Sequence, residues 1–280
     1  MMRKPKQVGT SQVADALQRA AAALQNRRPD EAERIAAEVL AKEPQHPGAS
    51  HLLGVALVEQ GRPREAIAPL EEAARRRSDA VVETHLAMAL RQVGRSAQAI
   101  ATLERATARQ PAFPLAFHEL GVLLFAQGRL DEAEAALRSG LQAAPTMPEF
   151  SVVLGGIFLQ RADRANAKVA FARALANAPG HPKALCGFGT ALMDDGEFAP
   201  AAERFRQALV RDPGNAQAHL GLATCMLELG RWDEAVASFR AAVSAAPQFY
   251  GAALRALVAA GRGQFWLKPS AAAEMLKPKN

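Results

Sequence analysis

The sequence predicts an all-α protein built as an α-solenoid, a stack of about seven helical hairpins. An alanine recurs every 34 residues, with one interval of 33. Six of these alanines are followed by a proline twelve residues later, and most are preceded by a glycine five residues earlier. Such a period implies supersecondary units that bury their apolar faces against one another. The recurring alanines are Ala32, Ala66, Ala99, Ala133, Ala167, Ala201 and Ala235.

Residues 1–12 precede the first unit, are basic, and are expected to be flexible. The apolar stretch that follows is interrupted at Asp15, Gln18 and Arg19 before it reaches the length of a signal peptide. No segment approaches the length of a transmembrane span. We therefore expect a cytoplasmic protein without membrane contact.

Seven units fill residues 13–249, and each is expected to form two helices. Proline opens several first helices, where its missing N–H is harmless, and glycine at position 15 closes most of them. Position 8 is Gly or Ala, position 20 is always Ala, and positions 7, 11 and 24 are mostly large and apolar, which predicts closely approaching helices. The units are 13–46, 47–79, 80–113, 114–147, 148–181, 182–215 and 216–249.

The end of the chain departs from the repeat. Residues 250–261 are expected to form one unpaired capping helix, because a stack needs its open apolar end covered. Residues 262–280 are expected to be a flexible basic tail that carries Phe265, Trp266 and Leu267. Packing of Trp266 over the last hairpin is favoured over a docking motif, since burying the ring offsets the cost of ordering the tail.

The repeat resembles the tetratricopeptide repeat family, whose unit has Leu-Gly at positions 7 and 8, Ala at 20, Phe at 24 and Pro at 32. Leu120-Gly121 matches the first pair, and Ala201, Phe205 and Pro213 match the remaining positions. The tryptophan that the family has at position 4 is absent throughout, and Glu83 replaces it in the third unit. The resemblance implies a right-handed superhelix that binds other proteins.

No feature of the sequence indicates catalysis, a cofactor or a metal. Phosphate-binding loops, HExxH and GxSxG are missing, and Cys186 and Cys225 have no ligand spacing. His51, His85 and His118 fall on consecutive first helices, but a three-histidine metal site is disfavoured because it needs all three nitrogens close to one ion. The formal charge is +6, yet arginines alternate with glutamates, which disfavours a nucleic-acid partner.

The leading hypothesis is a non-enzymatic adaptor that binds a partner protein or peptide in the concave groove. By the resemblance, positions 2, 5, 9, 12 and 13 of each first helix line that groove. One alternative is the separated substrate-presenting arm of a sulfotransferase, glycosyltransferase or hydroxylase system, and another is self-assembly into a homo-oligomer. The predicted groove residues are His51, Val55, Thr84, Met88, Arg91, His118, Val122, Phe125, Lys183, Thr190 and Thr224.

Overall fold

The computed structural model describes residues 7–260 and 269–277, with side chains described from residue 12 to 259 and from 269 to 277. Within these ranges every regular element is a helix, as the sequence predicts. The chain divides into two compact units, residues 1–144 and residues 145–280, and each is described by itself. No helix in the described ranges is both long enough and apolar enough to cross a bilayer.

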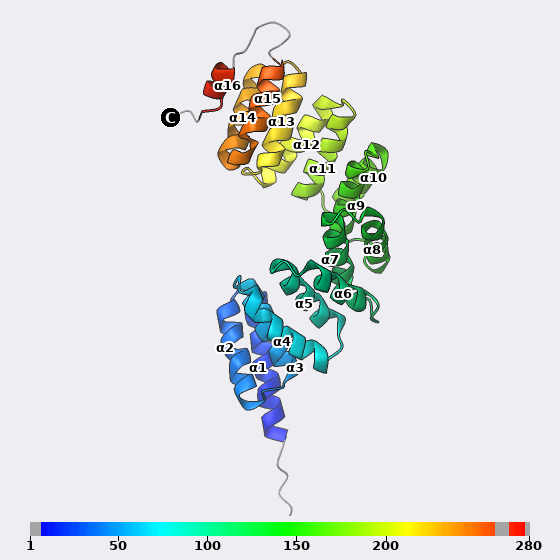
Figure 1. Ribbon diagram of the computed structural model, residues 1–280, viewed down its shortest axis with the longest axis vertical. Helices are drawn as coiled ribbons and strands as arrows, with labels where there is room; N and C mark the ends of the chain where they lie inside the picture. Colours follow the sequence, from blue (N-terminus) through cyan, green and yellow to red (C-terminus); the bar gives the residue numbers. More distant parts are fainter. Residues whose placement is uncertain (1–6, 261–268, 278–280) are drawn as a thin grey trace, which may run out of the picture. The chain divides into compact units, whose positions relative to one another are not determined.

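Unit 1 consists of helices packed in consecutive pairs (Figure 1). Each pair joins a first helix to a second helix through a short turn, and each second helix then packs against the next first helix. The first helices also pack on one another, α1 on α3, α3 on α5 and α5 on α7. The pairs are α1 (Gln7–Gln25) with α2 (Pro29–Lys42), α3 (Pro47–Glu59) with α4 (Pro63–Arg76), α5 (Ala80–Gln92) with α6 (Ser96–Thr107), and α7 (Pro114–Ala126) with α8 (Leu130–Ala143).

Unit 2 repeats this arrangement and adds two further helices at its C-terminal end (Figure 1). The first helices again lie side by side, α9 against α11 and α11 against α13. The pairs are α9 (Pro148–Gln160) with α10 (Arg164–Asn177), α11 (Pro182–Asp194) with α12 (Phe198–Arg211), and α13 (Ala216–Glu228) with α14 (Trp232–Ala245). A 3₁₀ turn at Pro247–Phe249 leads into α15 (Tyr250–Ala260), and α16 (Pro269–Met275) follows.

Several first helices begin with a cap that the sequence provides. The ring nitrogen Nδ1 of His46 accepts a hydrogen bond from the backbone N–H of Ala49 at 3.2 Å, and His181 does the same for Ala184 at 3.3 Å. Each histidine precedes a proline at the first helical position, which needs no intrahelical hydrogen bond. These two histidines are therefore structural.

The turn inside each hairpin uses a left-handed residue at position 15. Gly61, Gly94, Gly128, Gly196 and Gly230 have φ between 72° and 81°, as their position predicts. Arg27 and Ala162 hold the same position and also adopt positive φ, 54° and 57°. The same turn geometry therefore forms in two hairpins that lack glycine at this position.

The core follows the predicted alternation of small and large residues. A Cβ added to Gly121 would stand 2.5 Å from Leu137, and one added to Gly155 would stand 2.5 Å from Phe171. These pairs are positions 8 and 24 of the same hairpin, so the side chain of the second helix lies directly on the backbone of the first. Close contact of this kind leaves no room for a side chain at position 8 of these two hairpins.

Both ends of the chain differ from the expectation. Helix α1 begins at Gln7, so part of segment 1–12 is helical rather than flexible. In the expected tail, α16 packs on α15, and the side chains of Ala272 and Leu276 are buried. The guanidinium of Arg240 donates to the carbonyl oxygen of Met275 at 2.8 Å and fixes this end of the chain on α14. Trp266 lies outside the described residues, so its predicted packing stays a prediction.

Candidate partner-binding surface

One side of the first helices of unit 1 carries most of the predicted groove residues. Positions 5, 9 and 12 of a helix fall on the same side, because residues four and three apart are neighbours on a helix surface. Since α3, α5 and α7 lie side by side, equal positions of these helices share that side. We call this the first-helix surface, made of His51, Val55, Met88, Arg91, His118, Val122 and Phe125, all partly exposed.

The apolar part of the first-helix surface crosses three helices. Val55, Met88 and Val122 occupy position 9 of α3, α5 and α7, and Phe125 occupies position 12 of α7. Each of these apolar side chains is partly exposed to solvent. Accessible apolar side chains at equivalent positions of adjacent helices form a strip that a protein partner can cover.

A pair of histidines joins α3 to α5 beside this strip. The Nε2 atom of His51 lies 3.0 Å from Nδ1 of His85, and the ring centroids are 5.0 Å apart. Burial, and then the neighbouring His85, lowers the pKa of His51 to about 4, and burial lowers the pKa of His85 as well. Both rings are therefore neutral at pH 7 and hydrogen-bonded to one another. His85, which sits at position 6, was not among the predicted groove residues.

A second polar group joins α5 to α7. The guanidinium of Arg91 lies 3.3 Å from a carboxylate oxygen of Glu119, and Nδ1 of His118 lies 3.6 Å from the other oxygen. Burial would raise the pKa of Glu119, but the hydrogen bond from His118 and the charge of Arg91 outweigh it, so the pKa is lowered. Two predicted groove residues are thus held by a buried carboxylate that the sequence reasoning did not single out.

These contacts separate the three histidines that the sequence places on consecutive helices. His51 pairs with His85, whereas His118 pairs with Glu119. Across the described residues no group of three or more His, Cys, Asp or Glu side chains is arranged to hold a metal ion. His51 thus takes part in a contact between neighbouring helices, whereas His118 contacts the adjacent carboxylate of its own helix.

Thr84 is not available to a partner, contrary to the expectation. Its side chain is fully buried, and its hydroxyl donates to the carbonyl oxygen of Ala80 at 2.6 Å. Position 5 of α5 therefore faces neighbouring helices, while the same position in α3 and α7 is partly exposed. Surface and core positions are one helical step apart, so a small local rotation changes which of them a side chain occupies.

The predicted residues of unit 2 are polar and sparse. Lys183 is exposed at the start of α11, while Thr190 and Thr224 donate their hydroxyls to carbonyl oxygens one turn earlier, at 3.1 and 3.0 Å. The two cysteines are free and buried, and burial raises the pKa of each thiol to about 11. Both thiols are therefore protonated at pH 7 and serve as small core residues.

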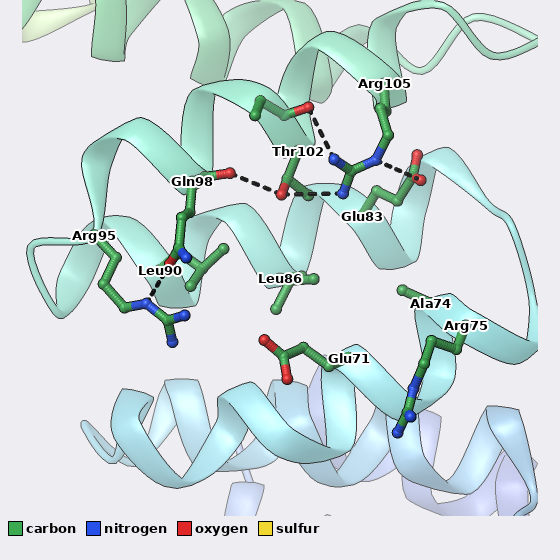
Figure 2. Close-up of a pocket in the computed structure, with 11 residues that line it drawn as sticks. Glu71, Ala74, Arg75, Glu83, Leu86, Leu90, Arg95, Gln98, Thr102 and Arg105 are labelled. Carbon is green, nitrogen blue, oxygen red and sulfur yellow. Dashed lines mark hydrogen bonds and ion pairs between the residues drawn. The ribbon is translucent and has the colours of Figure 1, made fainter.

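A pocket of about 560 Å³ lies on the opposite side of α5, between α4 and α6 (Figure 2). Leu86 and Leu90 line its floor together with Glu83, whose carboxylate is buried. Arg109 donates to both oxygens of this carboxylate, at 3.1 and 3.3 Å, and Arg105 lies 3.6 Å from it. The sequence signal for the pocket was Glu83 itself, a charged residue at the position where the family has tryptophan.

Comparison with known proteins agrees with this fold. Sequence profiles of the tetratricopeptide repeat match residues 23–89, 85–148 and 186–248, which is more than half of the chain. No curated protein matches the chain.

Similar solved structures include a tetratricopeptide repeat protein from Parabacteroides merdae, with 16% identity, a TM-score of 0.64, and coverage of 84% of this chain and 93% of that one. PilF of Pseudomonas aeruginosa is 17% identical, with a TM-score of 0.66 and coverage of 75% and 96%. The hetero-tetramer Cut9–Hcn1 of the APC/C gives 16% identity and a TM-score of 0.70, covering 81% of this chain but only 45% of that chain.

At these identities the structural likeness shows the fold alone, and the sequence profiles show the family. Tetratricopeptide repeats generally mediate protein–protein interaction, typically as non-catalytic scaffolds. The chain belongs to the tetratricopeptide repeat family.

Proposed function

We propose that this protein is a non-enzymatic scaffold that holds a partner polypeptide against the first-helix surface of unit 1. The observation that carries the proposal is the strip of partly exposed apolar side chains, Val55, Met88, Val122 and Phe125, on three adjacent helices. Concave faces lined by equivalent helices are the surfaces that helical repeat proteins use for binding.

The polar groups beside the strip indicate how a partner would be held. His51 is hydrogen-bonded to His85, and the charge of Arg91 is balanced within the protein by Glu119, which also lies 3.6 Å from His118. A partner therefore gains most from covering apolar area, at roughly 25 cal/mol per Å² of apolar surface removed from water. An extended or helical segment with apolar side chains at regular spacing meets this requirement.

The proposal is tested by using the purified chain as bait in a lysate of its source organism. A variant with Met88→Gln and Phe125→Gln removes apolar area from the first-helix surface without adding charge. A matched variant, Val169→Gln with Val210→Gln, makes the same kind of change at valines that are 68% and 80% exposed on second helices. Circular dichroism confirms that all three proteins are folded.

We expect the wild type and the valine variant to recover a protein that the first-helix variant does not recover. Recovery of the same proteins by all three baits would place binding elsewhere on the chain. Light scattering on each protein separates partner binding from self-assembly, because only self-assembly raises the mass of the isolated chain with concentration.

A further inference from the structure

We infer that the pocket between α4, α5 and α6 is a second binding site, which takes an acidic segment of a partner protein that also carries an apolar side chain. This site does not depend on the proposed function, because it lies on the opposite side of α5 from the first-helix surface. Glu83, Leu86 and Leu90 recur at intervals of three and four along α5 and face the pocket (Figure 2).

The apolar requirement comes from the floor and the walls. Leu86 and Leu90 form the floor, while the small side chains of Ala74 on α4 and Ala101 on α6 border the pocket and leave it open. The volume of about 560 Å³ falls in the range of pockets that bind ligands. An apolar side chain of a partner can enter here and cover the two leucines.

The acidic requirement comes from the balance of charge around the floor. The lining holds three arginines, Arg75, Arg95 and Arg105, against Glu71 and Glu83. Both oxygens of Glu83 already accept from Arg109, which lies outside the lining, so this carboxylate does not attract a cation. Glu72 likewise pairs with Arg75 from outside the lining. With both outside residues counted, four arginines stand against three glutamates, so the net charge at the pocket is positive.

The donors that remain free are on two of these arginines. Arg95 donates from Nε to the side-chain oxygen of Gln98, and among the described residues no acceptor lies on its Nη atoms. Arg75 forms an ion pair with Glu72 through only one of its Nη atoms. Arg95 comes from the start of α6 and Arg75 from α4, so the two arginines stand on different walls of the pocket. A carboxylate of a peptide can accept two parallel hydrogen bonds from the planar guanidinium group of one arginine.

The test measures binding of fluorescein-labelled peptides to the full chain by anisotropy at low salt. Three short peptides share the same leucines and differ only in flanking residues, which are Glu, Gln or Lys. Arg95→Asp reverses the charge and keeps the fold, because Arg95 is the N-cap of α6 and Asp is a favoured N-cap. Ala101→Trp fills the pocket from an exposed position.

The next hairpin provides a matched control for each variant. Arg129 is the N-cap of α8, and Ala135 is exposed on α8, at the positions equivalent to Arg95 and Ala101. Neither residue lines the pocket. Arg129→Asp and Ala135→Trp therefore change charge and size at the same places in a hairpin that lies outside it.

The Glu peptide should bind at least about tenfold more tightly than the Lys peptide, which corresponds to about 1.4 kcal/mol. Arg95→Asp and Ala101→Trp should each weaken its binding about tenfold, and the two control variants should bind as the wild type does. Equal or tighter binding of the Lys peptide, no binding of any peptide, or equal losses in a variant and its control would overturn the inference. Loss of binding on Met88→Gln with Phe125→Gln would place the peptide on the first-helix surface and would overturn it as well.

Discussion

Two phenylalanine rings in unit 2 are each held between a pair of glycines, and this contact supports a quantitative prediction. Phe171 on α10 faces Gly155 on α9 and Gly187 on α11. A Cβ on Gly187 would stand 2.3 Å from both Cε1 and Cζ of the ring. Carbon atoms in contact are about 3.5–4.0 Å apart, so Gly187→Ala forces the ring or the helix to move by about 1 Å.

The expected cost follows from two opposing effects. Replacing glycine by alanine inside a helix normally stabilises by about 1 kcal/mol. Overfilling a packed core costs about 1–3 kcal/mol, so Gly187→Ala should destabilise by up to about 2 kcal/mol overall. Gly251→Ala in α15 is the control, because its nearest neighbour is the flexible end of Arg255, at 3.4 Å, and it should be neutral or stabilising.

Native-state hydrogen exchange on α10 and α11 is the suitable assay, because stacked repeats open locally and need not unfold in a single step. Phe171→Leu should restore protection to Gly187→Ala, since leucine holds the equivalent position in α4, α6 and α8. In those cases the residue of the next hairpin that corresponds to Gly187 is His85, Glu119 or Val153. The coupling between the two changes should exceed about 1 kcal/mol. Strictly additive effects, or increased protection in Gly187→Ala alone, would refute the packing argument.

Three further predictions concern the turns, the histidine pair and the C-terminal end. Ala162→Gly should stabilise the α9–α10 hairpin by about 0.5–1 kcal/mol in urea unfolding, because Ala162 has a φ of 57°. Because the pKa of His51 is about 4 in the folded protein and 6.5 when unperturbed, the unfolded chain binds more protons between these values. Stability should fall by up to about 3 kcal/mol as the pH drops from 6.5 to 4, and His51→Gln should flatten that slope in urea titrations. Removing residues 269–280 uncovers the contact made by Leu276, so it should lower the melting temperature in calorimetry, whereas an unchanged value would show that α16 contributes nothing to stability.

The sequence predicted the helices well because their signals are local. The spacing of alanine, glycine and proline is set by what each residue can do in a helix or turn, so it marks where helices begin and end. Helices α3, α7, α9 and α11 begin at the prolines that open the predicted units. The left-handed turns at Arg27 and Ala162 carry no such local signal, and only the repeat register indicates them.

Features that depend on neighbouring hairpins were harder to predict. Gly187 and Gly221 lie at position 6 of their units, against Phe171 and Phe205 of the preceding hairpins. The pairing of glycine at position 6 with phenylalanine in the hairpin before it is visible in the sequence, but only once the contact is known.

Two parts of the candidate sites depended on packing that no local pattern describes. Thr84 was expected in the groove but is buried. Whether its position is exposed depends on how α5 is rotated about its axis relative to the helices that pack on it. The pocket beside Glu83 requires α4 and α6 to border the same side of α5. Sequence reasoning identified Glu83 only as a departure from the family and assigned it no role.

Site-specific photo-crosslinking can show whether a partner lies on the first-helix surface of unit 1. A photoreactive amino acid at Val122 or Val55 reports on this surface, and one at Val169 or Val210 reports on second helices of unit 2. We expect a partner recovered from the source lysate to crosslink through Val122 and Val55 and not through the other two positions. Crosslinking confined to Val169 or Val210 would contradict this expectation.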